Sequence, residues 1–148
     1  MPGIALGAIA IGLDRIDEQG EAMQVYKHTK TYADLATAGV TNNITLFSLG
    51  AGQVIHKVKI KHSIAFAGGA LASYTISLGI TGELAKYATA FNVFQAAAGT
   101  TMQLSEGPWT EDHGAAVDVK IAAVSTGANL DAATAGSVDV WFWISNAL

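Results

Sequence analysis

Residues 54–66 read VIHKVKIKHSIAF, in which two kinds of side chain alternate along the chain. The first set is mostly apolar and consists of Val54, His56, Val58, Ile60, His62, Ile64 and Phe66. The second set contains three lysines and consists of Ile55, Lys57, Lys59, Lys61, Ser63 and Ala65. Because successive side chains of a β-strand point to opposite faces, the alternation predicts one long strand. One face of this strand is expected to be buried and the other to meet water or a partner.

The rest of the chain repeats this plan in shorter segments. Alternating or β-branched runs occupy 23–32, 44–49, 72–80, 100–104, 116–124 and 137–145, with Gly-rich or polar stretches between them. Many short strands separated by turns predict an all-β protein, namely an antiparallel β-sandwich or jelly roll with an extended N-terminal arm. One segment differs, because Leu84, Tyr87, Ala88 and Phe91 recur at helical spacing. A short helix is expected there, with an irregular crossover as the alternative.

The composition limits the classes of function. The chain has 148 residues, which suits one domain, and only 14% of them are charged, compared with about 25% in ordinary soluble domains. This favours a surface partly covered by partners over a monomer with an exterior rich in small residues. The net charge of −4 argues against a nucleic-acid partner. The absence of cysteine excludes disulfides, thiolate metal sites and cysteine nucleophiles.

The sequence divides into an N-terminal arm, residues 1–22, and a β-sandwich domain, residues 23–148. The apolar part of the arm is shorter than the roughly 20 residues that a membrane span needs, and no basic residue precedes it as in a signal peptide. No membrane association is therefore expected. The arm is interpreted either as a frayed first strand or as a segment that docks on another subunit. Its candidate partner-binding residues are Ile4, Leu6, Ile9, Ile11 and Leu13.

No set of residues predicts catalysis, a metal site or a cofactor. His56 and His62 share a predicted face but lie about 20 Å apart in an extended strand, too far to share a metal ion. They are expected to be half-buried and hydrogen-bonded near the two ends of the core face. The acidic stretch 106–113 lacks the ligand spacing of a calcium loop and is interpreted as solvated. No GxSxG motif is present, so the protein is not expected to be an enzyme.

Two surface features predict contact with partners. Lys57, Lys59 and Lys61 form a positive row, interpreted either as a solvated strand that resists aggregation or as a strip facing an acidic protein surface. Trp141 and Trp143 lie opposite the predicted core face of the last strand. Exposed tryptophans are favoured at interfaces, so this pair is expected either in a homo-oligomer contact or beneath the chain's own arm or loops.

Several short segments resemble a group of small structural proteins of tailed bacteriophages. These segments are LGAGQVI at 49–55, AFAG at 65–68, SLG at 77–79 and TAGSVDVW at 134–141. The resemblance covers about residues 40–145 and leaves the arm without a counterpart. It implies a virion component without an active site, similar to the β-sandwich decoration or cement proteins that sit on capsid shells, often as trimers.

Three hypotheses follow from the residues and the resemblance. The first is a capsid decoration or cement protein that is made in the host cytoplasm, binds the major capsid protein on the virion surface and forms a homo-oligomer, with a trimer favoured. The second is a tail or fibre module that binds host carbohydrate on Trp109, Trp141 and Trp143. The third, a small enzyme on a jelly-roll fold, requires clustered histidines and carboxylates that the spacing does not offer.

Overall fold

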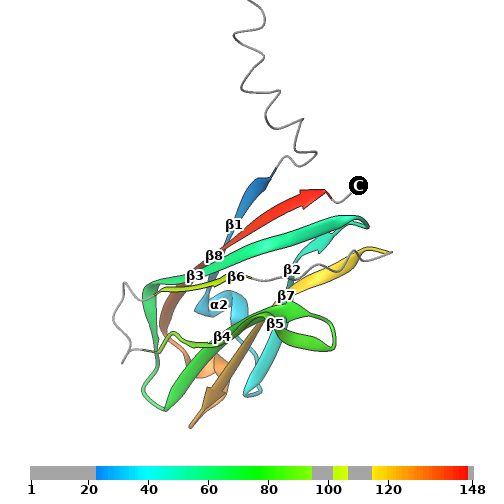
Figure 1. Ribbon diagram of the computed structural model, residues 1–148. Helices are drawn as coiled ribbons and strands as arrows, with labels where there is room; N and C mark the ends of the chain where they lie inside the picture. Colours follow the sequence, from blue (N-terminus) through cyan, green and yellow to red (C-terminus); the bar gives the residue numbers. More distant parts are fainter. Residues whose placement is uncertain (1–22, 95–101, 107–114, 147–148) are drawn as a thin grey trace, which may run out of the picture.

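The computed structural model describes residues 23–94, 102–106 and 115–146 (Figure 1). These residues form eight β-strands, one short α-helix and one 3-10 turn. The elements are β1 (Gln24–Thr31), α2 (Tyr32–Leu35), β2 (Thr41–Leu49), β3 (Gln53–Ala67), β4 (Ser73–Ile80), β5 (Glu83–Asn92), β6 (Met102–Glu106), β7 (Val117–Thr126), η1 (Leu130–Ala132) and β8 (Ala135–Asn146).

The strands pair as one long antiparallel ribbon that is rolled up on itself. Counted from the two ends of the ribbon, β1 pairs with β8, β2 with β7, β3 with β6 and β4 with β5. Further pairing of β3 with β8 and of β4 with β7 joins the ribbon into two four-stranded sheets. Their strand orders are β1-β8-β3-β6 and β2-β7-β4-β5. This arrangement is a jelly roll, and it confirms the predicted all-β fold.

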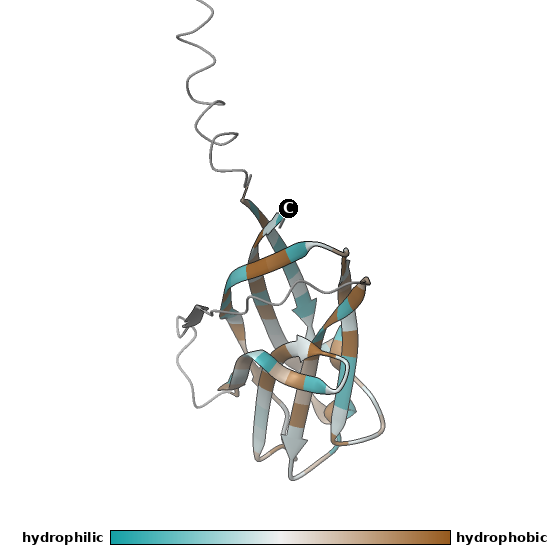
Figure 2. Cartoon of the chain, turned by 45° about the vertical axis from the view of Figure 1, so that its right-hand side comes forward, coloured by the Kyte–Doolittle hydropathy of each residue, from teal (hydrophilic) through white to brown (hydrophobic). Residues whose placement is uncertain are grey.

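The core lies between the two sheets and is built from one face of each strand. The predicted alternation of β8 is confirmed, since Val138, Val140, Phe142 and Ile144 are all buried. From the opposite sheet, β4 contributes Tyr74, Ile76 and Leu78. Apolar and polar colours alternate along the strands in Figure 2, as this packing requires. Removing this apolar area from water, at about 25 cal/mol per Å², is the main force that holds the sheets together.

The long strand β3 follows the predicted alternation in its middle and again at Phe66, but not between these parts or near its start. Val58, Ile60 and His62 are buried, whereas Ile64, predicted to face the core, is 56% exposed and Ile55, predicted to face outward, is only 2% exposed. The pairing of β3 with β8 shifts between Ile55 and Lys57 and again between His62 and Ile64. A β-bulge inserts one extra residue and so moves the following side chains to the other face. Strict period two therefore assigned the wrong face to Ile55 and Ile64. Phe66 is buried as predicted, after a third shift between Ile64 and Ala67.

The predicted helix around Leu84 is wrong, because these residues form β5. The register of β5 against β4 shifts twice, between Ile76 and Leu78 and between Leu78 and Ile80. As a result Tyr87, Ala88 and Phe91 are all buried, at a spacing that imitates one face of a helix. The helix that does form is α2, which begins at the last residue of the predicted strand 23–32. Its capping box joins Thr31 and Asp34, each side chain accepting a hydrogen bond from the other's backbone N–H.

Gly136 of β8 occupies a position that no other residue fits. Its φ is +144°, and a Cβ atom there would lie 2.4 Å from the ring of the buried Phe66. We expect Gly136→Ala to lower the free energy of unfolding by about 2 kcal/mol or more, from backbone strain together with overpacking. Denaturant unfolding measures this. Gly69→Ala is the matched control because nothing lies within 4 Å of its added Cβ; equal losses in both variants would contradict the assignment.

The two histidines of β3 differ from each other. His56 is half-buried and its Nε2 lies 2.5 Å from the Ser145 hydroxyl, as predicted. The prediction for His62 is wrong: it is fully buried, and neither ring nitrogen has a hydrogen-bond partner among the residues that the structure describes. Its ring instead packs near Phe91, with the ring centroids 6.0 Å apart. His62 acts as a core residue that carries an unsatisfied polar edge.

We expect His62→Leu to raise the free energy of unfolding by about 1 kcal/mol, because it replaces a buried unpaired polar ring by an apolar side chain. His56→Leu is the matched variant and is expected to lose about 1 kcal/mol, since it breaks the bond to Ser145. Thermal or denaturant unfolding of both proteins gives the comparison. A His62→Leu protein less stable than His56→Leu would show that the His62 ring is bonded in solution.

Candidate functional site

The lysine row and the tryptophan pair, which are distant in sequence, lie on one face of one sheet. β3 and β8 are antiparallel neighbours, so residues directly opposite each other project from the same side. This side is the outer one, because the residues between them, such as Val58 and Phe142, fill the core. The facing pairs are Lys57 with Trp143, Lys59 with Trp141, and Lys61 with Asp139.

The lysine side chains lie over the tryptophan rings. Lys57 Nζ is 4.4 Å from the centroid of the Trp143 ring, and Lys59 Nζ is 4.1 Å from that of Trp141. Lys27, on β1, approaches Trp141 from the other side, with its Nζ at 5.4 Å. Each cation–π contact contributes about 0.5–1 kcal/mol at an exposed site. Together they hold both rings partly covered and fix the ammonium groups above them.

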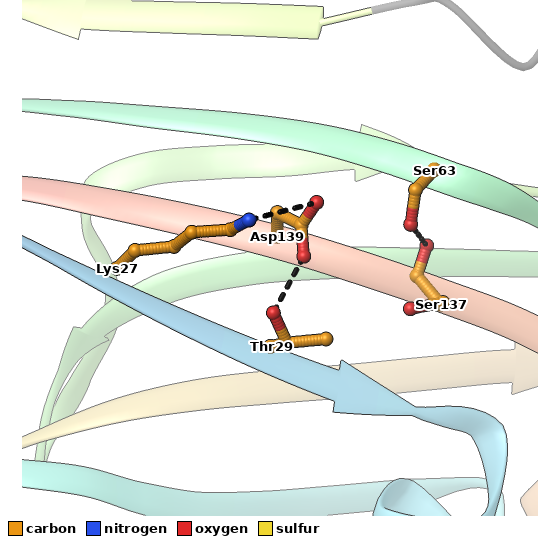
Figure 3. Close-up of polar contacts among 5 residues, drawn as sticks. All are labelled: Lys27, Thr29, Ser63, Ser137 and Asp139. Atoms are coloured by element: carbon orange, nitrogen blue, oxygen red, sulfur yellow. Dashed lines mark hydrogen bonds and ion pairs between the residues drawn. The ribbon is translucent and has the colours of Figure 1, made fainter.

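Asp139 is the one acidic side chain that the structure describes on this side of the sheet, and it is already bound. Its Oδ2 lies 3.8 Å from Lys27 Nζ, and its Oδ1 accepts a 2.6 Å hydrogen bond from the Thr29 hydroxyl (Figure 3). Beyond it, the Ser63 hydroxyl donates to the Ser137 carbonyl oxygen at 3.3 Å. The Asp139 side chain is only 15% exposed, whereas that of Lys27 is 52% exposed. The carboxylate therefore anchors β1 to β8 and offers little negative charge to a partner.

We call this surface the Lys/Trp face and define it by Lys27, Lys57, Lys59, Lys61, Trp141 and Trp143. It holds four of the eight Lys and Arg residues of a chain whose net charge is −4. Among the side chains that the structure describes, no carboxylate makes an ion pair with the three lysines of β3. Glu106 of β6 lies in register with Lys57. At its edge Val25, in register with Trp143, is 50% exposed. The face thus combines aromatic area with an excess of positive charge.

This combination suits a contact with an acidic protein surface. Tryptophan is enriched among the residues that dominate binding energy at protein interfaces, and charge complementarity adds specificity and a faster encounter. The sequence predicted the lysines and the tryptophans as separate features and missed Lys27. A signal for Lys27 existed in the alternation of Val25, Lys27 and Thr29, but only the pairing of β1 with β8 places it beside Trp141.

The remaining candidates fall elsewhere. The candidate residues of the arm lie outside the described residues, namely Ile4, Leu6, Ile9, Ile11 and Leu13. The same holds for Trp109 and for the acidic loop after Glu106. Within the described ranges, no three His, Asp or Glu side chains come together as a metal ion would require. In the same part of the chain, no helix is long and apolar enough to cross a membrane.

Comparison with solved structures shows the same fold in capsids. A chain of the cyanophage Pam1 capsid asymmetric unit matches with a TM-score of 0.62 at 19% sequence identity, covering 86% of each chain. A chain of the capsid of Ralstonia phage GP4 matches with a TM-score of 0.50 at 15% identity, again over 86% of each chain. No protein-family profile and no curated protein matches the sequence. The likeness therefore concerns the fold.

Proposed function

We propose that the protein is a structural component of a phage capsid. The observation that carries this proposal is the match to the Pam1 capsid chain, which extends over 86% of both chains at a TM-score of 0.62. The GP4 capsid chain supports it over the same share of its length. A jelly roll hosts many functions, so a second support is needed. The Lys/Trp face provides it, because its aromatic area and positive charge suit a contact with another protein.

Within the capsid, we propose the role of a decoration or cement protein on the virion surface. In this role the chain binds major capsid subunits and stabilises the shell. The arm binds the shell through apolar side chains, namely those of Ile4, Leu6, Ile9, Ile11 and Leu13. The Lys/Trp face binds an acidic partner. Copies associate as a homo-oligomer, for which a trimer fits the resemblance noted in the sequence.

The alternative, a tail or fibre module that binds carbohydrate, has less support. Sugars bind tryptophan by stacking on an open ring face, but Lys57 and Lys59 already lie over the rings of Trp143 and Trp141 at 4.4 and 4.1 Å. A sugar would have to displace both ammonium groups and would lose the cation–π contacts. The same arrangement favours a partner that brings carboxylates to the lysines.

Binding to capsids tests the proposed function. Purified protein is mixed with capsids of the encoding phage that were assembled without this chain, and the mixture is sedimented. We expect saturable binding at a fixed number of copies per capsid and greater resistance of the bound capsids to heat. Capsids that already carry a full complement of the protein are the control and are expected to bind no more. Absence of binding, with the protein found instead in isolated tails, would overturn the proposal.

A further inference from the structure

The Lys/Trp face imposes a condition on whatever covers it. Two copies that met through this face by a two-fold axis would bring four lysines of one copy against four lysines of the other, because a two-fold contact uses the same surface twice. Like charges facing each other in an interface cost several kcal/mol. Simple face-to-face stacking of the tryptophan pairs is therefore ruled out as the cover. The occupant has to be a different surface, and an acidic one.

The chain carries such a surface directly before β1. Residues 14–21 read DRIDEQGE, with four carboxylates against one arginine, a net charge of −3. By strand register, Glu106 of β6 lies opposite Lys57 and Asp139 of β8 opposite Lys61. The Lys/Trp face and its surroundings therefore carry four lysines against two acidic residues, a net charge of +2. In an extended conformation these eight residues span about 26 Å. That length crosses β1, β8 and β3, which are spaced about 5 Å apart.

We propose that residues 14–21 of a second copy of this chain lie across the Lys/Trp face. The inference deepens the proposed function and rests on it for the role of the face as a protein contact. In this arrangement carboxylates of the segment meet the ammonium groups of Lys57 and Lys59, which stay over the tryptophan rings. The partner of the face is thus an acidic peptide that the protein itself supplies.

The position of β1 favours a second copy over the chain's own segment. β1 starts at Gln24, opposite Ile144, at the edge of the sheet and at the end where Trp143 lies. Only Ala22 and Met23 separate it from the acidic segment. A reversal in two residues forms a hairpin in the plane of the sheet, which places the returning chain beside β1 rather than above β8 and β3. A segment that arrives from a neighbouring copy has no such restriction.

The arrangement has a consequence for assembly. Each copy gives a segment and receives another on a different part of its surface, so the contact is heterologous. Heterologous contacts form a ring when the rotation between copies closes, and an open filament when it does not. A trimeric ring satisfies every face and every segment. Residues 1–13, which precede the acidic segment, then extend beyond the neighbour's face and remain available for a different partner.

Charge reversal tests this inference in the full-length protein. The face variant is K57E/K59E and the segment variant is D17K/E18K, and the two are also combined. Light scattering coupled to size exclusion, over a range of concentrations, measures self-association. We expect each reversal alone to weaken it at least tenfold and the combination to restore it to near the wild-type value. The matched control is K30E/K120E, which makes the same change in net charge away from the face and is expected to associate normally.

Cross-linking identifies the copy that provides the segment. Protein labelled with ¹⁵N is mixed with unlabelled protein, and a zero-length amine–carboxyl reagent joins Lys57 or Lys59 to acidic residues of 14–21. We expect mixed-isotope cross-links. Cross-links confined to one chain, failure of the combined variant to restore association, or a monomeric wild type would each overturn the inference. These measurements are made without capsids, so their failure would overturn only this inference. The proposed function is tested independently by the sedimentation assay with capsids.

Discussion

Replacing Trp141 and Trp143 together with serine is expected to weaken self-association about a thousandfold. Central aromatic anchors each account for about 2 kcal/mol or more when they are truncated at an interface. Two of them therefore contribute about 4 kcal/mol, which is about three powers of ten in the dissociation constant. The loss also frees Lys57 and Lys59 from the rings that fix them. Analytical ultracentrifugation across a dilution series measures the change.

The fold is expected to survive this double substitution. Both tryptophans lie on the outer side of β8, whereas the core side is filled by Val140, Phe142 and their neighbours. Tyr26→Ser is the control, because Tyr26 is also an exposed aromatic residue, 42% exposed, but lies off the Lys/Trp face. It is expected to leave association unchanged. If the tryptophan variant associates as strongly as wild type while remaining folded, the Lys/Trp face is not the interface.

Removal of residues 1–13 is expected to abolish attachment to capsids while leaving the body folded and associated. This deletion takes away the alternating apolar residues from Ile4 to Leu13 but keeps the acidic segment 14–21. Attachment is lost because an apolar arm gains its binding energy by burial against a partner. The fold is kept because the β-sandwich begins only at β1. Co-sedimentation with capsids and light scattering of the free protein read the two properties separately.

A second variant lacks residues 1–22. It is expected to lose both attachment to capsids and self-association. The truncated body should be monomeric as well as unable to attach, since the acidic segment is gone too. Circular dichroism checks that its strands remain. If the protein lacking residues 1–13 binds capsids with wild-type affinity, the arm does not bind the shell. The capsid-binding surface would then lie on the β-sandwich.

Local patterns predicted those strands that pair regularly. β8 was placed almost to its ends, and its two faces were assigned correctly, because its alternation from Val138 to Ile144 is uninterrupted. β3 and β5 were harder, since bulges change the phase of the alternation. A bulge is set by the neighbouring strand, which the local sequence does not show. For the same reason the buried Tyr87, Ala88 and Phe91 imitated a helix.

The candidate site was predictable in its parts but not as a whole. The lysines of β3 and the tryptophans of β8 each stood out by their spacing. The lysines and tryptophans come together because β3 pairs with β8, about 80 residues further along the chain. Lys27 approaches Trp141 because β1 pairs with β8, more than 110 residues away. Such nonlocal pairing is fixed by the packing of the whole sandwich. Consequently the sequence did not reveal that each tryptophan ring carries a lysine over its face.

Cryo-electron microscopy of virions that contain this protein tests the proposed capsid role. We expect density for the eight-stranded jelly roll on the capsid, repeated with the symmetry of the shell, with residues 1–13 running onto major capsid subunits. We also expect residues 14–21 of one copy to cross the Lys/Trp face of the next. Virions whose capsid density contains no copy of this fold, although the protein is present in the particle, would contradict this role.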